Sequence, residues 1–253
     1  MQRYFIQLSY DGTAYHGWQI QPNGVSVQEV VEKALSVVAR NTVSLTGAGR
    51  TDAGVHASFY IAHFDTDNLS LDNEKIIHNL NCLLPPDIAI QNIFKVPPDA
   101  HARFGAVSRT YKYYLNKTKD PFTRQYAAKE SRIPDLKRMN EAANKLFDYE
   151  DYTSFSRLGT DVKTNNCAIY LAEWAEEGNR YVFTIKADRF LRNMVRAIVG
   201  TLLDVGFGKI DIDDFCKIIE ARDRCAAGAS VPAKGLFLAD IGYPDNLSRG
   251  FII

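Results

Sequence analysis

The sequence predicts an α+β fold made of two similar halves. The chain has 253 residues, which is too long for one small domain at about 150 residues per domain. Short segments of alternating apolar and polar residues predict strands, and segments with apolar residues at helical spacing lie between them. The same order of predicted elements occurs twice, so we expect domains over residues 1–105 and 106–253.

The first half is predicted to follow the order β-α-β-β-α-β. Residues 3–10 alternate between two faces, with Gln7 on the polar face. Ser26, followed three residues later by Glu29, predicts a capping box at the start of the first helix. The Pro85–Pro86 pair must end the second helix, because proline cannot continue a helix. The other strands are predicted at 43–46, 58–64 and 88–96, and the first helix at 27–38.

The second half repeats this order with one additional helix. Strands are predicted at 106–115, 169–174, 181–185 and 236–241, and helices at 134–147, 190–205 and 211–221. The turn at 176–179 joins two of these strands as a hairpin. Each half therefore resembles the ferredoxin-like β-α-β-β-α-β motif, and we expect mixed, mainly antiparallel sheets.

Charge is distributed unevenly along a chain whose net charge is zero. The first hundred residues carry six basic and ten acidic side chains. Residues 103–138 carry ten basic and three acidic side chains, a local net charge of +7. Such asymmetry predicts a basic surface on an otherwise neutral protein, which would suit a nucleic acid. An ordinary solvated, lysine-rich face is the alternative explanation.

A glycine-rich stretch between two predicted strands, residues 47–57, is the first candidate site. Glycine permits a close approach of the backbone to a ligand. Arg50 and Asp52 are two residues apart, so they point the same way in an extended chain. An arginine keeps a neighbouring carboxylate ionised, and an ionised carboxylate can act as a nucleophile. The simpler interpretation is a connecting loop in which Asp52 makes a turn.

Basic and aromatic residues are interleaved in the second candidate site, residues 101–114. Arginines can hold phosphates, and tyrosines offer flat faces on which bases stack. Tyr111 and Tyr113 lie on the same face of the predicted strand, so periodicity cannot separate a binding tyrosine from a core tyrosine. The alternative is an ordinary strand with its tyrosines in the core, which we favour for Tyr113.

The third candidate site is the predicted helix at residues 190–200. Arg192 and Arg196 are four residues apart, so they are expected to share one flank of this helix. Arg196 lies next to the apolar stripe of the helix, where a charge needs a partner. A carboxylate such as Asp52 would provide that partner. The alternative is an arginine whose stem packs on the helix while its charged end reaches water.

Other features exclude several classes of protein. The apolar runs are too short to cross a membrane, and residues 1–4 show no signal-peptide features. The four cysteines contain no C-x-x-C pair, so we expect free thiols in a reducing compartment, the cytoplasm. His56 and His63 lack a third residue at metal-ligand spacing, so we expect no metal site.

Seven motifs resemble the tRNA pseudouridine synthase I family, also called the tRNA pseudouridine synthase A family. They are YDGTAYHGWQ (10–19), SVQE (26–29), GRTDAGVHA (49–57), HARF (101–104), RTYKYY (109–114), FLRNMVRAIVG (190–200) and KGLFL (234–238). They follow the family's order over nearly the whole chain, and GRTDAGVHA is highly specific. The resemblance implies an isomerase that converts uridine to pseudouridine at positions 38, 39 and 40 of the tRNA anticodon arm.

The resemblance also implies roles for single residues. Asp52 matches the catalytic aspartate, and Arg196 matches the arginine that pairs with it. Tyr111 matches the tyrosine that stacks on the target base, and Arg50 the arginine that helps displace that base. Leu236 matches an apolar residue that lines the pocket.

The family's tRNA contacts map to two segments of this chain. One comprises Ala100, His101, Ala102, Arg103 and Phe104, and the other, less closely matched, is 159–163. Members of the family are homodimers with two ferredoxin-like domains per chain, and they use no metal or organic cofactor. The resemblance therefore implies a cofactor-free homodimer that binds tRNA and no membrane.

The chain departs from the family pattern at two places. After GVHA the family often has Gly and then Gln, where this chain has Phe59 and Tyr60, so we expect altered packing with activity retained. The loop 160–167 matches poorly, so we assign it no part in catalysis. Two alternatives stay open: a pseudouridine synthase with another target uridine, and a non-catalytic RNA-binding module. The G-F-x-F signature typical of such modules is absent.

Overall fold

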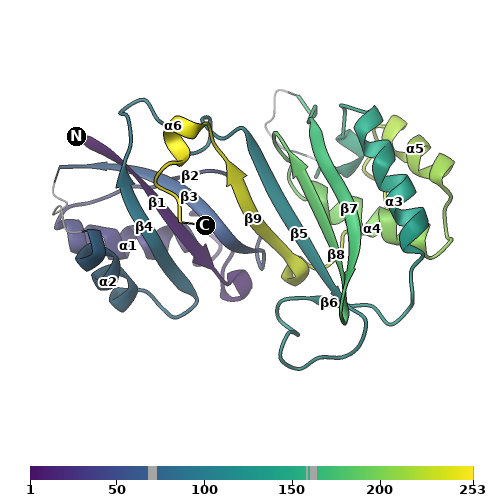
Figure 1. Ribbon diagram of the computed structural model, residues 1–253, viewed down its shortest axis with the longest axis horizontal. Coiled ribbons are helices and arrows are strands. Elements are labelled where there is room, and N and C mark those ends of the chain that lie inside the picture. The colour runs from purple at the N-terminus through teal and green to yellow at the C-terminus, as the bar shows by residue number, and fades with distance from the viewer. Residues whose placement is uncertain (68–72, 158, 160–163, 253) are drawn as a thin grey trace. The chain divides into compact units, whose positions relative to one another are not determined.

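A computed structural model of the chain describes residues 1–67, 73–157, 159 and 164–252. The chain forms two compact units, residues 1–108 with 238–253 (unit 1) and residues 109–237 (unit 2), shown in Figure 1. The sequence predicts domains over residues 1–105 and 106–253, and this division stays a prediction. Residues 238–253 cluster with unit 1, where Gln7 binds both backbone groups of Ile252.

Unit 1 is a sheet with two long helices. Its strands are β1 (Gln2–Tyr10), β2 (Thr46–Gly47), β3 (His56–Thr66), β4 (Ile88–Lys95) and most of β9 (Leu236–Gly242). Its α-helices are α1 (Val27–Ala39), α2 (Asn73–Leu83) and the short α6 (Asp245–Ser248). The strand order is β4-β1-β3-β9, with β2 beside β3, and β1 is antiparallel to both neighbours. Helix α2 packs on α1 and on β4.

Strand β1 is buried on both faces, whereas the sequence predicted one polar face. Phe5 is fully buried and Gln7 is 3% exposed. The chain's C-terminal segment covers this face: Gln7 donates to the Ile252 carbonyl at 2.6 Å and accepts from the Ile252 amide at 2.9 Å. The prediction for Gln7 was wrong because its partner lies 245 residues away in the sequence.

Unit 2 also combines a sheet with helices. Its strands are β5 (Ser108–Asn116, from residue 109 on), β6 (Ala128–Lys129), β7 (Ile169–Glu177) and β8 (Arg180–Ala187), and its helices are α3 (Leu136–Asn144), α4 (Met194–Gly206) and α5 (Ile212–Glu220). The order β5-β8-β7 is antiparallel, and β6 pairs parallel with β5. The three helices pack together at one side of this sheet (Figure 1). The predicted α+β class with mainly antiparallel sheets is confirmed.

Two predicted elements are shorter in the structure, each because of an identifiable contact or backbone conformation. The predicted strand 43–46 is reduced to β2, because α1 side chains bind the backbone before it: Ser36 accepts from the Val43 amide and Glu32 from the Leu45 amide. The predicted helix 190–205 starts only at Met194, since Asn193 adopts a left-handed conformation (φ 66°).

The late start of α4 overturns one argument about the arginines. Arg192 lies before α4 and Arg196 lies within it. The two residues therefore do not share a helix flank, and the prediction that they do was wrong. The left-handed Asn193 between them breaks the helical spacing on which that argument depended.

Helix α4 forms the centre of the unit 2 core. Eleven of its thirteen residues are buried, including Ile198, Val199 and Leu202. Fully burying such an aliphatic side chain contributes about 1.5–3 kcal/mol. Helix α5 docks nearby through Phe215 and Ile219 and begins with a capping box between Asp211 and Asp214. This core gives α4 a fixed position from which Arg196 projects.

Candidate active site

The loop 48–55, between β2 and β3, carries Asp52 in unit 1. The Tyr60 hydroxyl donates to the Gly49 carbonyl, and the Tyr10 hydroxyl lies 2.9 Å from the Thr51 hydroxyl. The Val55 amide donates to the Asp52 carbonyl at 3.1 Å. The backbone is therefore held on both sides of Asp52. Asp52 is half-buried and Arg50 is exposed.

The segment that follows β1 packs directly on this loop. Gly17 has a φ of 84°, and a Cβ at this position would overlap the Thr51 carbonyl oxygen. Only glycine fits, because it tolerates positive φ and adds no side chain. The Gly54 amide donates to the Tyr15 carbonyl at 3.3 Å, which adds a second contact. The segment 10–19 therefore supports the loop that carries Asp52.

His56 and His63 both contact the backbone. The Gly12 amide and an Asp11 carboxylate oxygen lie 3.1 and 3.0 Å from His56 Nδ1, and the Ala102 amide donates to His63 Nδ1 at 3.1 Å. Across the described ranges, no cluster of three or more His, Cys, Asp or Glu side chains is arranged to hold a metal ion.

The two tyrosines of β5 have different environments in unit 2. Tyr113 is fully buried, and its hydroxyl donates to the Pro232 carbonyl at 3.1 Å. Burial raises the pKa of Tyr113, an effect that the nearby Arg196 guanidinium partly offsets. Tyr111 is half-buried, and Phe190 meets its ring edge-on at 5.2 Å between centroids. Tyr113 therefore has a core role, whereas part of the Tyr111 ring stays accessible.

Arg196 is oriented by the chain segment that runs along α4. Its Nε donates to the Val231 carbonyl at 2.8 Å, and the Val231 amide donates back to the Arg196 carbonyl at 3.2 Å. The Gly228 amide also donates to the Thr201 hydroxyl at 3.0 Å. A side chain that donates to a buried backbone carbonyl is held in one direction. An arginine whose charged end contacts only water is not held in this way. This geometry argues against the simple snorkelling interpretation.

The predicted site residues divide between the units. Asp52 and Arg50 belong to unit 1, and Tyr111, Arg196 and Leu236 to unit 2. Within unit 2, contacts of Tyr113 link β5 to the 231–236 segment next to Arg196, and Leu236, 5% exposed, starts β9. The pairing of Asp52 with Arg196 stays a prediction.

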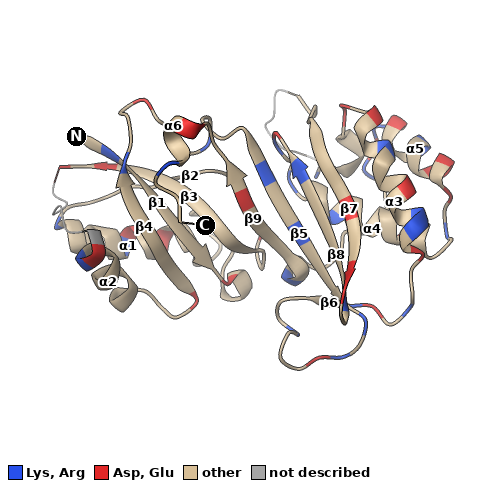
Figure 2. Cartoon of the chain, in the orientation of Figure 1, with Lys and Arg blue, Asp and Glu red and all other residues tan. Residues whose placement is uncertain are grey.

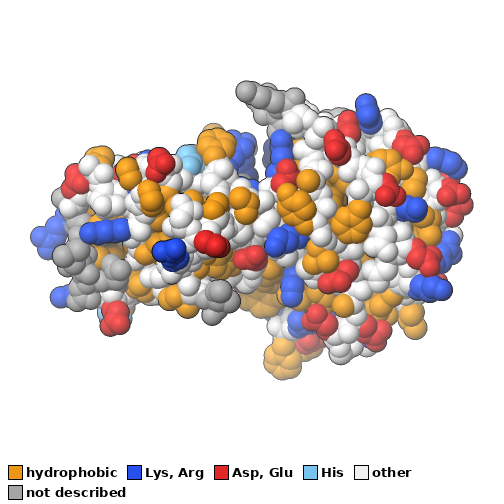
Figure 3. Space-filling view, turned by 45° about the horizontal axis from the view of Figure 1, so that its top comes forward, with side chains coloured by type: hydrophobic (Ala, Val, Ile, Leu, Met, Phe, Trp, Pro, Cys, Tyr) orange, Lys and Arg blue, Asp and Glu red, His pale blue; other side chains and the backbone are white. Residues whose placement is uncertain are grey.

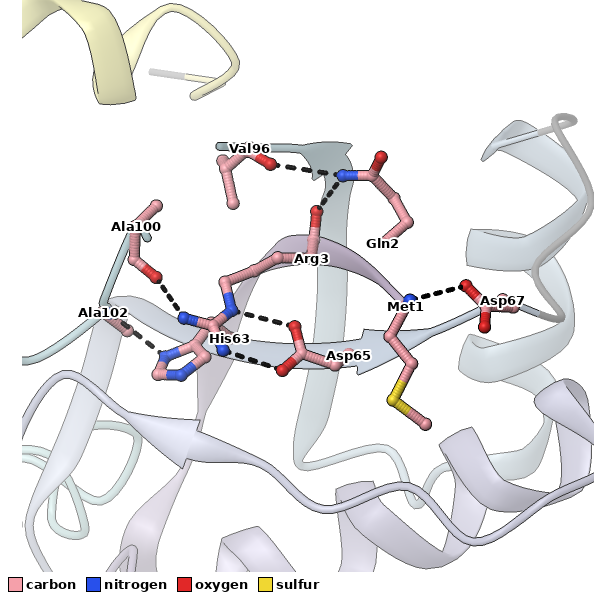
Figure 4. A network of polar contacts seen from close by, with 9 residues as sticks. All are labelled: Met1, Gln2, Arg3, His63, Asp65, Asp67, Val96, Ala100 and Ala102. Carbon is pink, nitrogen blue, oxygen red and sulfur yellow. Dashed lines mark hydrogen bonds and ion pairs between the residues drawn. The ribbon is translucent and has the colours of Figure 1, made fainter. Parts of the chain in front are cut away.

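The turn at 100–104 lies in unit 1 on a polar network, shown in Figure 4. Arg3 binds Asp65 through two bonds of 2.8 and 2.7 Å and donates to the Ala100 carbonyl at 2.9 Å. Tyr243 donates to the Ala102 carbonyl. The arginine lowers the pKa of Asp65 and so keeps this carboxylate ionised.

Two histidines complete the support of this turn. His101 Nδ1 accepts from the Arg103 and Phe104 amides at 3.1 and 3.2 Å, and its ring packs edge-on against His63 at 4.6 Å. Burial, together with the charges of His101 and Arg3, lowers the pKa of His63 to about 4. Both rings act as neutral acceptors, and they leave Arg103 exposed and Phe104 77% exposed. The second predicted contact segment, 159–163, lies outside the described residues except for Gly159.

The basic segment 103–138 carries less available charge than its composition indicates. Arg132 is bonded to Glu130 at 2.8 Å, and Lys117 is paired with Glu176. Figure 2 shows basic residues on β5, and Figure 3 shows acidic and basic side chains mixed on the visible face of unit 2. The exposed basic residues of the segment include Arg103, Lys119, Arg124, Lys129 and Lys137.

Sequence reasoning missed the residues that support the loop 48–55. Phe59 and Tyr60 were expected to be strand-interior residues that affect packing alone. Tyr60 is fully buried in β3, as such a position requires, but its hydroxyl also reaches the loop backbone. The available signal was a tyrosine at an interior position of a strand that borders the candidate loop.

Comparisons with known proteins agree with the motifs. The family model described as tRNA pseudouridine synthase matches residues 7–105 and 142–244. A Bacteroides fragilis protein named tRNA pseudouridine synthase A is 58% identical over 98% of both chains. A Bacteroides thetaiotaomicron protein of that name is 59% identical over 98% of this chain and 93% of its own, and a Bacillus subtilis one is 42% identical over 94% and 98%. The chain belongs to the tRNA pseudouridine synthase family.

Proposed function

We propose that this protein isomerises uridine to pseudouridine at positions 38, 39 and 40 of the anticodon stem-loop of tRNA. It is then an intramolecular transferase. The observation that carries the proposal is the position of Asp52 in a fixed glycine-rich loop, within a chain that matches relatives named tRNA pseudouridine synthase A over nearly its full length. Among the described residues, no helix has the length and apolar character needed to cross a membrane.

The reaction moves one bond within one nucleotide. The N1–C1′ glycosidic bond breaks, the uracil turns, and a C5–C1′ bond forms while C5 loses its proton. No atom enters or leaves overall, so the chemistry requires no cofactor. Ionised Asp52 acts as the nucleophile or proton acceptor. Attack at C1′, attack at C6 and abstraction of the C2′ proton each satisfy this balance.

Arg196 and Arg50 assist Asp52 in this proposal. Arg196 pairs with the carboxylate and keeps it ionised and aimed, because an adjacent cation favours the charged form. Its own direction is set by the Val231 carbonyl at 2.8 Å. Arg50 is exposed at the surface of the loop, where it can enter the space that the target base leaves.

Tyr111 receives the displaced base. Flipping a base costs a few kcal/mol, and stacking on an aromatic ring returns about 1–3 kcal/mol. The edge-on contact with Phe190 fixes the plane of the Tyr111 ring. The hydroxyl of Tyr111 also serves as general base for the proton on C5, and Leu236 lines the pocket.

The 100–104 turn and the basic segment hold the RNA. Ala100, His101 and Ala102 supply the fixed backbone of the turn, and Arg103 and Phe104 supply a charge and a ring at its surface. Each neutralised phosphate contributes about −0.7 to −0.9 to the slope of log affinity against log salt. The working form is a cytoplasmic homodimer, in which the tRNA body crosses the second subunit.

The test is a site-mapping assay without added metal or cofactor. The purified protein and its Asp52→Ala variant are incubated with uridine-containing anticodon stem-loop RNA. Pseudouridine is then mapped by carbodiimide-dependent reverse-transcription stops. Product at positions 38–40 with the wild type alone supports the proposal. Product at another uridine keeps the chemistry and changes the substrate. Tight, salt-sensitive binding without any product favours the non-catalytic RNA-binding module.

A further inference from the structure

A single buried hydroxyl contacts the loop 48–55 at its start. Tyr60, on β3, is fully buried. Its oxygen donates to the Gly49 carbonyl, and the Gly49 amide lies 3.4 Å from the same oxygen. One hydroxyl therefore binds both polar backbone groups of the residue that precedes Arg50. This hydroxyl is the one polar group that a tyrosine side chain has.

The position of this hydroxyl is set by packing. The Tyr60 ring stacks on Trp18 with 4.1 Å between centroids and 30° between planes, and Tyr10 packs on it at 5.7 Å. Gly47 closes the remaining side, because a Cβ there would overlap the Tyr60 hydroxyl and the Trp18 indole nitrogen. The ring therefore cannot turn away without displacing this whole cluster.

Two tyrosines of this cluster support the loop at alternate residues. Tyr60 binds Gly49, and Tyr10 reaches the Thr51 hydroxyl at 2.9 Å. Asp52 is the next residue after Thr51. From this geometry we infer that Tyr60 is a positioning residue for catalysis: its hydroxyl fixes the backbone from which Arg50 and Asp52 act. The inference rests on the proposed function, since it requires that Asp52 takes part in the reaction.

The effect of Tyr60 on the loop must be separated from an ordinary contribution to stability. Tyr152 provides a matched control in unit 2. It is also fully buried, and its hydroxyl also donates to a backbone carbonyl, that of Leu146. Replacing either tyrosine with phenylalanine keeps the ring and removes the hydroxyl that donates to a backbone carbonyl, so both changes lower stability.

The experiment compares Tyr60→Phe with Tyr152→Phe in single-turnover and steady-state assays on anticodon stem-loop RNA. For Tyr60→Phe we expect kcat to fall about tenfold, because small misplacements of reacting groups are costly, while KM changes less than about twofold. For Tyr152→Phe we expect a lower Tm than that of wild type, as for Tyr60→Phe, with an unchanged kcat. Equal kcat values for wild type and Tyr60→Phe would overturn the inference.

Hydrogen exchange supplies a readout that does not depend on turnover. Without RNA, the amides of residues 48–55 should exchange faster in Tyr60→Phe than in wild type, and at the wild-type rate in Tyr152→Phe. If Tyr60→Phe does not fold, Trp18→Phe replaces it: this variant keeps the hydroxyl and loosens its ring, and we expect a loss in kcat of about two- to threefold. An unchanged kcat in the variant that folds would reject the inference, and unchanged exchange would reject the support of the loop on which the inference depends.

The same assays separate this inference from the proposed function. If Asp52→Ala keeps wild-type turnover, the proposed function fails and Tyr60 has no catalytic group to position. If Asp52→Ala is inactive and Tyr60→Phe has the wild-type kcat, the proposed function stands and the role of Tyr60 fails.

Discussion

The loop 48–55 and the 100–104 turn both belong to unit 1, but chemically different interactions hold them. Gly49 and Thr51 of the loop are held by neutral tyrosine hydroxyls above stacked rings. The turn depends on an arginine–carboxylate pair and on two histidines that must stay neutral. Tyrosine hydroxyls stay neutral in acid, whereas an unfolded histidine takes up a proton near pH 6.5 that the folded His63 excludes until about pH 4. Mild acid should therefore weaken the turn before it affects the tyrosine supports of the loop.

This difference separates the two parts of the proposed function. The loop carries the group assigned to chemistry, and the turn carries groups assigned to RNA binding. Substitutions in the loop should lower kcat at constant affinity, and substitutions beneath the turn should lower affinity at constant kcat. A single change that moved both quantities equally would show that the two regions act as one.

The largest effect is expected for Asp52→Asn. The amide has nearly the same shape as the carboxylate but carries no charge, so it is a poor nucleophile. We expect turnover to fall by more than about 10³-fold, while the affinity for anticodon stem-loop RNA stays within about threefold of wild type. Product formation and filter binding measure the two quantities. The exposed Asp213, on α5, provides the control through Asp213→Asn, which should change neither.

The next effect is a loss of stability in acid that originates beneath the turn. The pKa of His63 is lowered to about 4 in the folded protein, whereas an unfolded histidine titrates near 6.5. As pH falls below about 6.5, the unfolded chain takes up a proton that the folded protein excludes. The contribution of neutral His63 to stability is therefore fully present above about pH 6.5 and is lost progressively as the pH falls toward 4. We expect a loss of about 2 kcal/mol between pH 7.5 and 4.5, measured by urea unfolding.

His63→Asn tests the origin of this loss. The Asn carbonyl can replace Nδ1 as the acceptor for the Ala102 amide, and it does not titrate. The variant should show a flatter dependence of stability on pH over the same interval. A pH dependence as steep as that of wild type would assign the effect to other groups.

The sequence predicted the elements whose causes are local. Alternation predicted β1, and Ser26 does cap α1 by accepting from the Glu29 amide, three residues away. The Glu29 carboxylate, by contrast, pairs with Lys33 at 2.5 Å, a choice that the capping pattern does not reveal. The candidate loop was recognised from its glycines and from its likeness to a known family.

What could not be predicted depends on contacts between distant residues. Arg3 and Asp65 are 62 residues apart, and Ala102 and His63 are 39 apart. No periodicity links such positions, because strand register and the path of the chain end decide which side chains meet. The hydroxyl of Tyr60 is a similar case: burial was expected from the strand, but its bond to Gly49 depends on how the loop folds back.

A smaller effect is expected from removing the charge pair beneath the turn. Arg3→Met keeps much of the side chain's length and removes its bonds to Asp65 and to the Ala100 carbonyl. Because both partners are partly exposed, water replaces some of these bonds, and we expect a stability loss of about 1 kcal/mol. The displaced turn should raise the KM for RNA about tenfold with kcat unchanged. Lys33→Ala breaks an exposed ion pair on α1 and should alter neither constant.

The smallest effect is expected at the exposed surface of the turn. It distinguishes the charge of Arg103, which can bind a phosphate, from the role of Arg3 in holding the turn in place. Arg103 is exposed, and its guanidinium lies 5.6 Å from the centre of the Phe104 ring. If the Arg103 guanidinium neutralises one phosphate, Arg103→Ala should reduce the slope of log affinity against log salt by about 0.7–0.9. The affinity at moderate salt should then fall about threefold. Fluorescence titrations at four salt concentrations measure this slope, with Lys33→Ala as the control. Arg3→Met, in contrast, should weaken binding mainly through geometry, which keeps the slope closer to that of wild type. Identical slopes for wild type and Arg103→Ala would remove Arg103 from the RNA contact and restrict the role of the turn to Phe104 and the backbone.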